Sequence, residues 1–293
     1  RLGLQNDAYA LVRAGFADAP LFLSLAESYK GEQDATVWGD LATNLRGMEA
    51  LIYEEPYLDQ FQTYGRDLFE DLVHRIGWDA RTGEGHLDAL LRSTGLGQAG
   101  SYGNPQVLEE AHARYERFLK DPTSLHPDLR GVVIALVAEN GDRLIYDTLW
   151  DLERSATLQE EKMRFLGALT RFHQKEFLQE TLERSMDPAE VRIQDTMLVV
   201  TALAANRYGR DLAWEFLKNN WEEFDRRYGA GGFAMMRLVQ IAGRFTTPDQ
   251  LKDVETFFKE HPTPSASRTV EQSLERISLN IKWLENNRVS IAQ

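Results

Sequence analysis

The residues best suited to chemistry in this sequence form a short cluster, Glu84, His86 and Asp88, in the segment GEGHLDALLR. Carboxylates and an imidazole this close together could bind a metal ion or move a proton. The same residues also suit the start of a helix, because acidic side chains in a first turn are stabilised by the helix dipole. We interpret the cluster as a helix start and keep the metal or acid–base site as its alternative.

One arginine near the end of the chain is the candidate for binding a ligand. Arg268 follows the turn His-Pro-Thr-Pro-Ser and lies in the expected first turn of the last helix. A cation is disfavoured there by the helix dipole, so we expect a carboxylate partner. That partner is either an Asp or Glu of the fold or the carboxylate of a bound peptide. Arg192 and Asp195 are interpreted in a similar way, as an ion pair at a helix start.

The sequence contains none of the familiar catalytic motifs. No His-Glu-x-x-His occurs, and none of the six histidines has a second histidine four residues later, the spacing that zinc peptidases use. No phosphate-binding glycine loop and no Gly-x-Ser-x-Gly nucleophile turn is found. Cysteine is absent, which excludes disulfides and thiolate metal sites within the chain. We therefore predict no catalytic residue, no metal ligand and no cofactor in this chain.

An aromatic stripe near the end of the chain has helical spacing and could form a wall that stacks a ligand. Helix packing explains such a stripe better, because aromatic residues at intervals of three and four normally face a core. A glycine-rich segment follows it at 228–233 and is interpreted as a helix stop and a turn. The stripe consists of Trp214, Leu217, Trp221, Phe224 and Tyr228.

Composition limits the class of partner. The chain has 293 residues, is 43% hydrophobic and 27% charged, and carries a formal net charge of −13. A globular fold is expected, and binding to nucleic acid or to an anionic membrane is not, because phosphate neutralisation needs clustered Lys and Arg. No apolar run approaches the roughly 18 residues of a membrane span. The chain starts without Met inside a helical pattern, so we expect a piece of a larger protein without a signal peptide.

Nearly every segment has the apolar period of a helix. Helices of about 10–20 residues joined by short turns form a bundle or a stack of helix pairs. So many helices favour the stack, and we predict an all-α, HEAT-like or armadillo-like α-solenoid of antiparallel helix pairs with degenerate repeats, as one domain over 1–293. The expected helices are 4–14, 19–30, 35–53, 57–76, 84–99, 105–119, 127–139, 142–154, 158–170, 173–185, 190–206, 208–228, 232–244, 248–260 and 266–288.

Local signals mark where these helices begin and end. Thr247, Pro248 and Gln250 form a capping box with proline at the first helical position. Asp18 before Pro20 and the pair Asp187-Pro188 are read as similar starts. Gly31, Gly77 and Gly229 are expected to end helices.

Two further expectations concern packing. The glycine-rich stretch 95–105 is expected to be the softest part of the fold, although not a domain boundary. The last helix is expected to pack through one apolar seam, spaced four, three, four and three residues apart. That seam consists of Val270, Leu274, Ile277, Ile281 and Leu284.

Six blocks along the chain carry a resemblance to a known family. They are RLGLQND (1–7), TVWGDLATNL (36–45), GWDARTGEGHLDALLR (77–92), AEVRIQDT (189–196), AWEFLKNNWEEFDRRYGAGGF (213–233) and FFKEHPTPSASRTVEQSLERISLNIKWL (257–284). In order and spacing these blocks are similar to successive parts of the C-terminal helical domain of M1 zinc aminopeptidases. Within that family the HPTPSA turn and the EGHLDALLR block most resemble the puromycin-sensitive branch.

The resemblance implies a cytoplasmic enzyme that removes N-terminal residues from peptides with one zinc ion. In this family the zinc ligands and the exopeptidase motif Gly-Ala-Met-Glu-Asn lie on an upstream domain, and neither motif occurs here. The resemblance therefore implies a bowl-shaped domain that encloses substrate and gates the site by hinge motion. Its implied partners are the peptide and the upstream catalytic domain. Arg268 matches an arginine of related tails and is the one substrate-binding residue carried over.

Two alternatives stay open at this point. The chain could be a freestanding helical-repeat scaffold that binds another protein on its concave face, which a parent sequence without an upstream His-Glu-x-x-His would support. It could also be an independent enzyme with an unrecognised site.

Overall fold

The computed structural model describes residues 1–230 and 233–292 of the chain. These residues form α helices and short 3-10 helices (η) and contain no strand, so the predicted all-α stack of helix pairs is confirmed. The elements are α1 (Leu2–Arg13), α2 (Ala19–Glu27), α3 (Ala35–Glu49), α4 (Leu58–Ile76), α5 (His86–Ser101), α6 (Pro105–Lys120), η1 (Pro122–Ser124), α7 (Pro127–Glu139), α8 (Arg143–Ser155), α9 (Gln159–Leu169), α10 (Lys175–Ser185), α11 (Ile193–Leu203), α12 (Arg210–Asn219), α13 (Trp221–Tyr228), α14 (Phe233–Gln240), η2 (Ile241–Arg244), α15 (Pro248–Glu260), η3 (Pro264–Ala266) and α16 (Ser267–Ile291).

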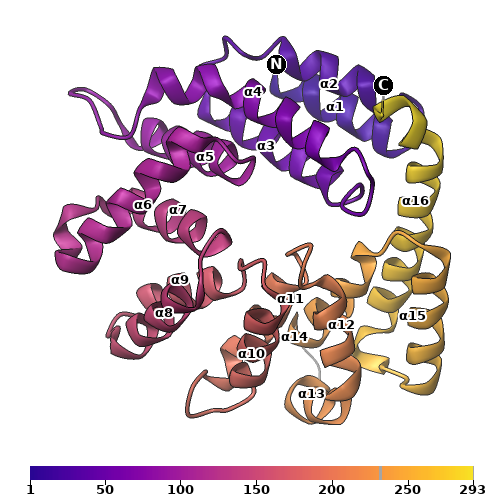
Figure 1. The fold of residues 1–293 in the computed structure, drawn as a ribbon. Helices are drawn as coiled ribbons and strands as arrows, with labels where there is room; N and C mark the ends of the chain where they lie inside the picture. The colour runs from indigo at the N-terminus through magenta and orange to yellow at the C-terminus, as the bar shows by residue number, and fades with distance from the viewer. Residues whose placement is uncertain (231–232, 293) are drawn as a thin grey trace. The chain divides into compact units, whose positions relative to one another are not determined.

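The chain forms two compact units. One consists of Arg1–Val137 together with Trp283–Gln293, and the other of Ala138–Lys282. In the first unit α1 packs against α2 and α3, and α5 packs against α3, α4 and α6. In the second unit α8 packs against α9, α10 against α9, α11 and α12, and α11 against α14. Figure 1 shows these successive helices as neighbouring pairs. A single domain over 1–293 stays a prediction.

Each unit has an aromatic core. In the first unit the rings of Trp38 and Phe69 are 5.0 Å apart and both side chains are fully buried. In the second unit Tyr146 lies 5.3 Å from Phe172 and stacks on Phe177 at 4.9 Å. These rings join α3 to α4 and α8 to α10, and aromatic pairs at such distances add to the hydrophobic burial.

Several predicted helix ends are confirmed by their hydrogen bonds. The Thr247 hydroxyl accepts the backbone N–H of Gln250, and the Gln250 side chain accepts the N–H of Thr247, so the capping box at α15 is complete. Asp18 is the N-cap of α2 by its position, with proline in the first turn, although its side chain makes no capping hydrogen bond. Gly77 ends α4 with φ at +62°, a conformation that glycine adopts most easily.

Other predicted boundaries are wrong. The expected helix 208–228 is two helices, because Asn220 leaves the helical conformation and its amide donates to the carbonyl of Phe216, a local bond that competes with the helix. Asp187 and Pro188 form a turn, and α11 starts only at Ile193. Helix α2 ends at Glu27, before Gly31.

The glycine-rich stretch 95–105 is not the soft segment that we expected, since most of it continues α5 to Ser101. Its glycines allow close packing between helices. A Cβ atom added at Gly100 would lie 2.6 Å from the side chain of Leu136 in α7. Because Gly100 has no side chain, α5 and α7 can approach each other closely. The glycine thus serves helix packing and not loop flexibility.

Candidate functional site

Helix α16 carries the candidate residue Arg268, and its buried face differs from the predicted seam. Ile277 and Leu284 are buried as predicted, but Val270, Leu274 and Ile281 are only half-buried. The predicted apolar seam is therefore partly wrong. The buried face is rotated toward positions that include polar side chains, namely Thr269, Ser273, Asn280 and Asn287.

Two of these buried polar side chains, Asn280 and Ser273, bind backbone carbonyls of neighbouring elements. The Asn280 amide donates to the carbonyls of Gly243 at 3.2 Å and Phe245 at 3.0 Å, at the end of η2. The Ser273 hydroxyl reaches the carbonyl of Val239 at 3.5 Å. The last carbonyls of a helix have no hydrogen-bond partner within that helix. The hydrogen bonds from Asn280 and Ser273 therefore satisfy such carbonyls of α14 and η2, and they hold α16 beside these elements.

Arg268 follows η3 and lies in the first turn of α16, where its side chain is exposed. Within residues 1–230 and 233–292 no hydrogen bond or ion pair of this side chain is recorded, although we expected a carboxylate partner from the fold. The alternative in which Arg268 is held by a structural Asp or Glu is thus not supported. Its predicted role in binding substrate stays a prediction.

The cluster at Glu84 is a helix start, as interpreted. The Glu84 carboxylate accepts the backbone N–H of Arg81 at 2.9 Å and the guanidinium of buried Arg92 at 2.6 Å. These two hydrogen bonds lower the pKa of Glu84. Asp88 accepts the N–H of Gly85 at 2.8 Å, and His86 opens α5 in an exposed position. The carboxylates are therefore used by the fold.

A small cleft of about 120 Å³ lies beside this helix start. A ligand of several residues needs a site of roughly 300 Å³ or more, so this cleft does not fit one. Across the described part of the chain no group of three His, Asp or Glu side chains is placed to hold a metal ion. The cleft is lined by Trp78, Asp79, Ala80, Ala89, Arg92, His126, Asp128 and Leu129.

The aromatic stripe is core, which confirms the packing interpretation. Trp214 and Trp221 are buried, and their rings lie 5.3 Å and 5.2 Å from the ring of Phe257 in α15. The Trp214 indole N–H donates to Asp253 at 2.6 Å, so its polar atom is satisfied. Gly229 ends α13 as predicted, while 231–232 of the glycine-rich segment lie outside the described residues.

The predicted ion pair at the start of α11 is also confirmed. The Arg192 guanidinium lies 2.7 Å from the buried carboxylate of Asp195, which additionally accepts the Gln159 amide at 3.2 Å. The Arg192 side chain is therefore occupied by an ion pair at the start of α11.

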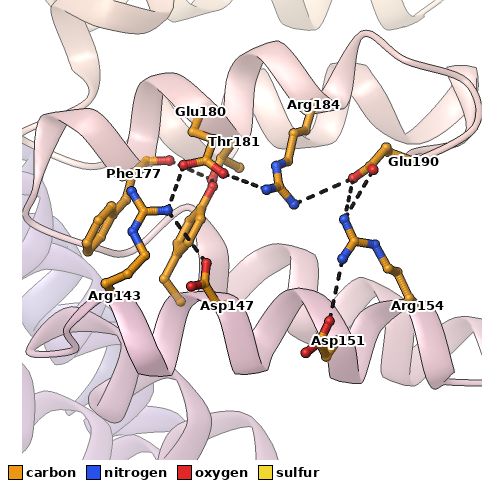
Figure 2. A network of polar contacts seen from close by, with 10 residues as sticks. Arg143, Asp147, Asp151, Arg154, Phe177, Glu180, Thr181, Arg184 and Glu190 are labelled. Atoms are coloured by element: carbon orange, nitrogen blue, oxygen red, sulfur yellow. Dashed lines mark hydrogen bonds and ion pairs between the residues drawn. The ribbon is translucent and has the colours of Figure 1, made fainter.

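A network of charges that we did not predict joins α8 to α10 and the turn after α10 (Figure 2). Glu180 accepts from Arg143 at 2.8 Å and from Arg184 at 2.6 Å, while Arg154 lies 3.0 Å from Glu190. Burial alone would raise the pKa of Glu180, but the hydrogen bond from Arg143 and the charge of Arg184 leave it lowered. Positive and negative groups alternate, so the network stabilises helix packing and offers no unpaired charge to a ligand.

Part of this network had a signal in the sequence. Arg143 and Asp147, and Glu180 and Arg184, are each four residues apart, a spacing that pairs charges along one helix. The bonds between the helices had no such signal, because their partners are 36 or 37 residues apart.

Comparison with known proteins identifies the helical stack. A family profile described as "ERAP1-like C-terminal domain" matches residues 1–279. The chain belongs to this family. This chain is also 32% identical to "Aminopeptidase M1-A" of Oryza sativa subsp. japonica, with 98% of this chain aligned to 33% of that protein.

Two further relatives agree. "Aminopeptidase M1" of Arabidopsis thaliana is 30% identical, with 98% of this chain and 33% of the relative covered. "Glutamyl aminopeptidase" of Sus scrofa is also 30% identical, with 99% of this chain and 31% of the relative covered. The chain thus spans about a third of the length of the curated relatives it matches. The resemblance to the C-terminal domain of M1 aminopeptidases is confirmed.

The described helices of this domain include none that combines the length and the apolar character needed to cross a bilayer.

Proposed function

We propose that this chain is the substrate-enclosing C-terminal domain of a cytoplasmic M1 zinc aminopeptidase, which removes N-terminal residues from peptides. The family match over residues 1–279 is the observation that carries the proposal. The relatives are named aminopeptidases and are about three times as long as the matched region, which leaves room for a catalytic domain. The partners on this proposal are the peptide and that catalytic domain.

The residues of this chain do not fit a zinc site. Its sequence lacks His-Glu-x-x-His, and its described residues hold no suitable group of His, Asp or Glu side chains. On our proposal the zinc ion and the chemistry of peptide cleavage belong to another part of the protein. What this chain contributes is binding and positioning of the peptide.

Arg268 is the residue that we assign to this binding. It is exposed, and within the described residues its guanidinium has no recorded partner. A guanidinium binds a carboxylate through two parallel hydrogen bonds, so Arg268 suits the carboxylate of a bound peptide. Holding the far end of the peptide would orient its N-terminus without touching the reacting atoms.

The test uses Arg268→Ala in the full-length enzyme, with aminopeptidase kinetics on peptides of increasing length. We expect KM for longer peptides to rise roughly three- to tenfold, since an exposed arginine–carboxylate pair contributes up to about 1 kcal/mol or somewhat more. Turnover of a short aminoacyl-dye substrate should stay nearly unchanged. Arg226→Ala serves as the control, because Arg226 is also exposed but is already paired with Glu223 at 2.6 Å.

Wild-type kinetics for both substrates in the Arg268→Ala enzyme would show that Arg268 has no role in binding.

A second measurement addresses the enzyme assignment itself. The 293-residue chain alone, mixed with zinc and an aminoacyl-dye substrate, should give no turnover, and chelator-sensitive activity would contradict the proposal. The freestanding-scaffold alternative predicts instead a parent sequence without His-Glu-x-x-His.

A further inference from the structure

Arginines of this chain almost always have a partner, and the exceptions lie on two neighbouring elements. All but four of the arginines in the described residues take part in a hydrogen bond, an ion pair or a ring contact. Four exposed arginines have no such contact recorded within the described residues. We call them the arginine strip: Arg237, Arg244, Arg268 and Arg276.

The strip lies on two neighbouring elements of the same compact unit. Arg237 and Arg244 belong to α14 and η2, and Arg268 and Arg276 to α16. The two elements are in direct contact, because a Cβ added at Gly243 would lie 3.3 Å from Cδ of Arg276. The hydrogen bonds of Asn280 and Ser273 to the carbonyls of η2 and α14 hold the same contact.

Helical geometry separates Arg268 from the other three side chains. Arg237 and Arg244 are seven residues apart, and the tighter turn of η2 offsets them by roughly 60°. Arg276 lies about 60° around α16 from Ser273, which faces α14, whereas Arg268 lies about 140° from Ser273. Glu275 lies about 20° and Glu271 about 60° around the helix from Arg268, so the cationic part of the strip is Arg237, Arg244 and Arg276.

The charge on α14 and η2 is positive although the whole chain is acidic. No Asp or Glu occurs from Arg226 through Pro248, in a chain with 46 acidic residues. The buried guanidinium of Arg210 lies directly below, donating to the carbonyl of Arg244 at 3.2 Å. Desolvation lowers the pKa of Arg244, and the positive charges of Arg210 and Arg276 lower it further, with no carboxylate opposing them. An anion at this surface would relieve that repulsion.

We propose that the arginine strip binds an extended acidic segment of polypeptide. Along each element the two arginines are separated by roughly 10–12 Å, at a rise of about 1.5–2 Å per residue. An extended peptide advances about 3.3 Å per residue and its side chains alternate between two faces, so carboxylates four residues apart lie on one face and approximately match that separation. Phe233 and Leu279 are exposed beside the strip, which gives apolar side chains of the segment a surface to contact.

Carboxylates fit this surface better than a nucleic acid does. The net charge of −13 repels a long phosphate backbone, whereas a short peptide meets only the charges within a screening length of about 8–10 Å. The inference extends the proposed function, on which it rests for the idea that the segment is a substrate. It names acidic peptides as the preferred class and three arginines besides Arg268 as their contacts.

Binding to the 293-residue chain tests the strip without any turnover. The probe is a fluorescein-labelled peptide with glutamates four residues apart, compared by anisotropy with the same peptide carrying glutamines. We expect the glutamate peptide to bind more tightly and to weaken as salt is raised. In the double variant Arg244→Gln, Arg276→Gln, we expect its Kd to rise roughly three- to tenfold, because each exposed charge pair contributes modestly.

A matched control removes the same charge elsewhere. Arg117 and Arg226 are exposed but paired with Glu110 and Glu223, so Arg117→Gln, Arg226→Gln should leave the Kd within about twofold. Thermal unfolding of both double variants checks that they are folded. Equal binding of the glutamine peptide, equal loss in the control variant, or tighter binding of a labelled single-stranded oligonucleotide would each overturn the inference. Since no catalysis is measured, these outcomes are independent of whether the parent protein is an aminopeptidase.

Discussion

At the scale of single residues, Glu32 organises the connection between α2 and α3. Its buried carboxylate accepts hydrogen bonds from Arg1 at 2.7 Å and from the backbone N–H groups of Gln33 at 2.7 Å and Asp34 at 3.0 Å. Its carbonyl accepts the indole N–H of Trp38 at 2.9 Å. The bonds to its carboxylate, that of Arg1 first, lower the pKa of Glu32 from 4.5 to about 2.

This lowered pKa predicts an acid-sensitive contribution to stability. A carboxyl group whose pKa is lower in the folded than in the unfolded chain stabilises the fold fully above the unfolded value, and this stabilisation is lost as the pH falls from about 4.5 toward 2. We expect Glu32→Gln to reduce the free energy of unfolding at pH 7 and to flatten its decrease over that pH range. Denaturant unfolding at a series of pH values measures both effects.

The control for this prediction is Glu27→Gln, because Glu27 is exposed on α2 and its carboxylate has no hydrogen bond recorded within the described residues. That variant should follow the wild-type dependence on pH. Parallel curves for Glu32→Gln and the wild type would show that the hydrogen bonds to Glu32 do not stabilise the fold.

Arg268 shows how far residue-level prediction from the sequence can reach. Its place in the first turn of the last helix followed from the preceding proline-rich turn, a local signal. The sequence could not predict whether an Asp or Glu from elsewhere in the fold pairs with Arg268, because such partners are distant in sequence. The same limit hid Arg244 and Arg276, whose surroundings depend on how η2 lies against α16.

At the scale of elements, helix positions were predictable and their buried faces less so. Caps such as Thr247 and the helical period act locally, so most helices occur where they were expected. The buried face of α16 was not predictable, because Ser273 and Asn280 are buried only where free carbonyls of α14 and η2 receive them. A polar residue in a helix gives no sign of such a partner.

Two glycines in helices predict opposite effects of the same substitution. Gly100→Ala would place a Cβ 2.6 Å from the side chain of Leu136, so we expect a loss of about 1–3 kcal/mol from overpacking between α5 and α7. Gly131 lies inside α7 with nothing within 4 Å of an added Cβ. Gly131→Ala should therefore stabilise the chain by about 0.5–1 kcal/mol through helix propensity.

Denaturant unfolding of the two variants measures this difference directly. The pair shares one chemical change, so the effect on the unfolded chain is the same and only the packing differs. If Gly100→Ala is as stable as Gly131→Ala, α5 and α7 do not pack as closely as described. The helix would then have room at a position where we infer contact.

At the scale of the whole molecule, the two compact units do not follow the order of the chain. The last residues, from Trp283, belong to the same unit as residues 1–137, while the intervening 138–282 form the other. The backbone N–H of Ala19 donates to the side chain of Asn287 at 2.8 Å, across 268 residues of sequence. Arg288 forms an ion pair with Glu55 at 2.6 Å. No local pattern predicts contacts of this length, so sequence reasoning treated the last helix only as the end of a stack.

This arrangement predicts that removing the last residues weakens the N-terminal helices first. A chain ending at Lys282 loses the buried side chains of Trp283, Leu284 and Asn287. Burial of the two apolar side chains alone contributes about 3–5 kcal/mol, and the N–H of Ala19 loses its acceptor. We expect hydrogen exchange in α1 and α2 to accelerate strongly, while exchange in α8 and α10 changes little.

Arg288→Gln separates the packing effect from the charge effect. It removes only the exposed end of an ion pair and should cost at most about 1 kcal/mol, so exchange in α1 and α2 should rise far less than in the shortened chain. The comparison that decides is between helices of the same shortened protein. If α8 and α10 exchange faster by as much as α1 and α2, then the last residues stabilise the chain globally. In that case they do not complete the unit formed with residues 1–137.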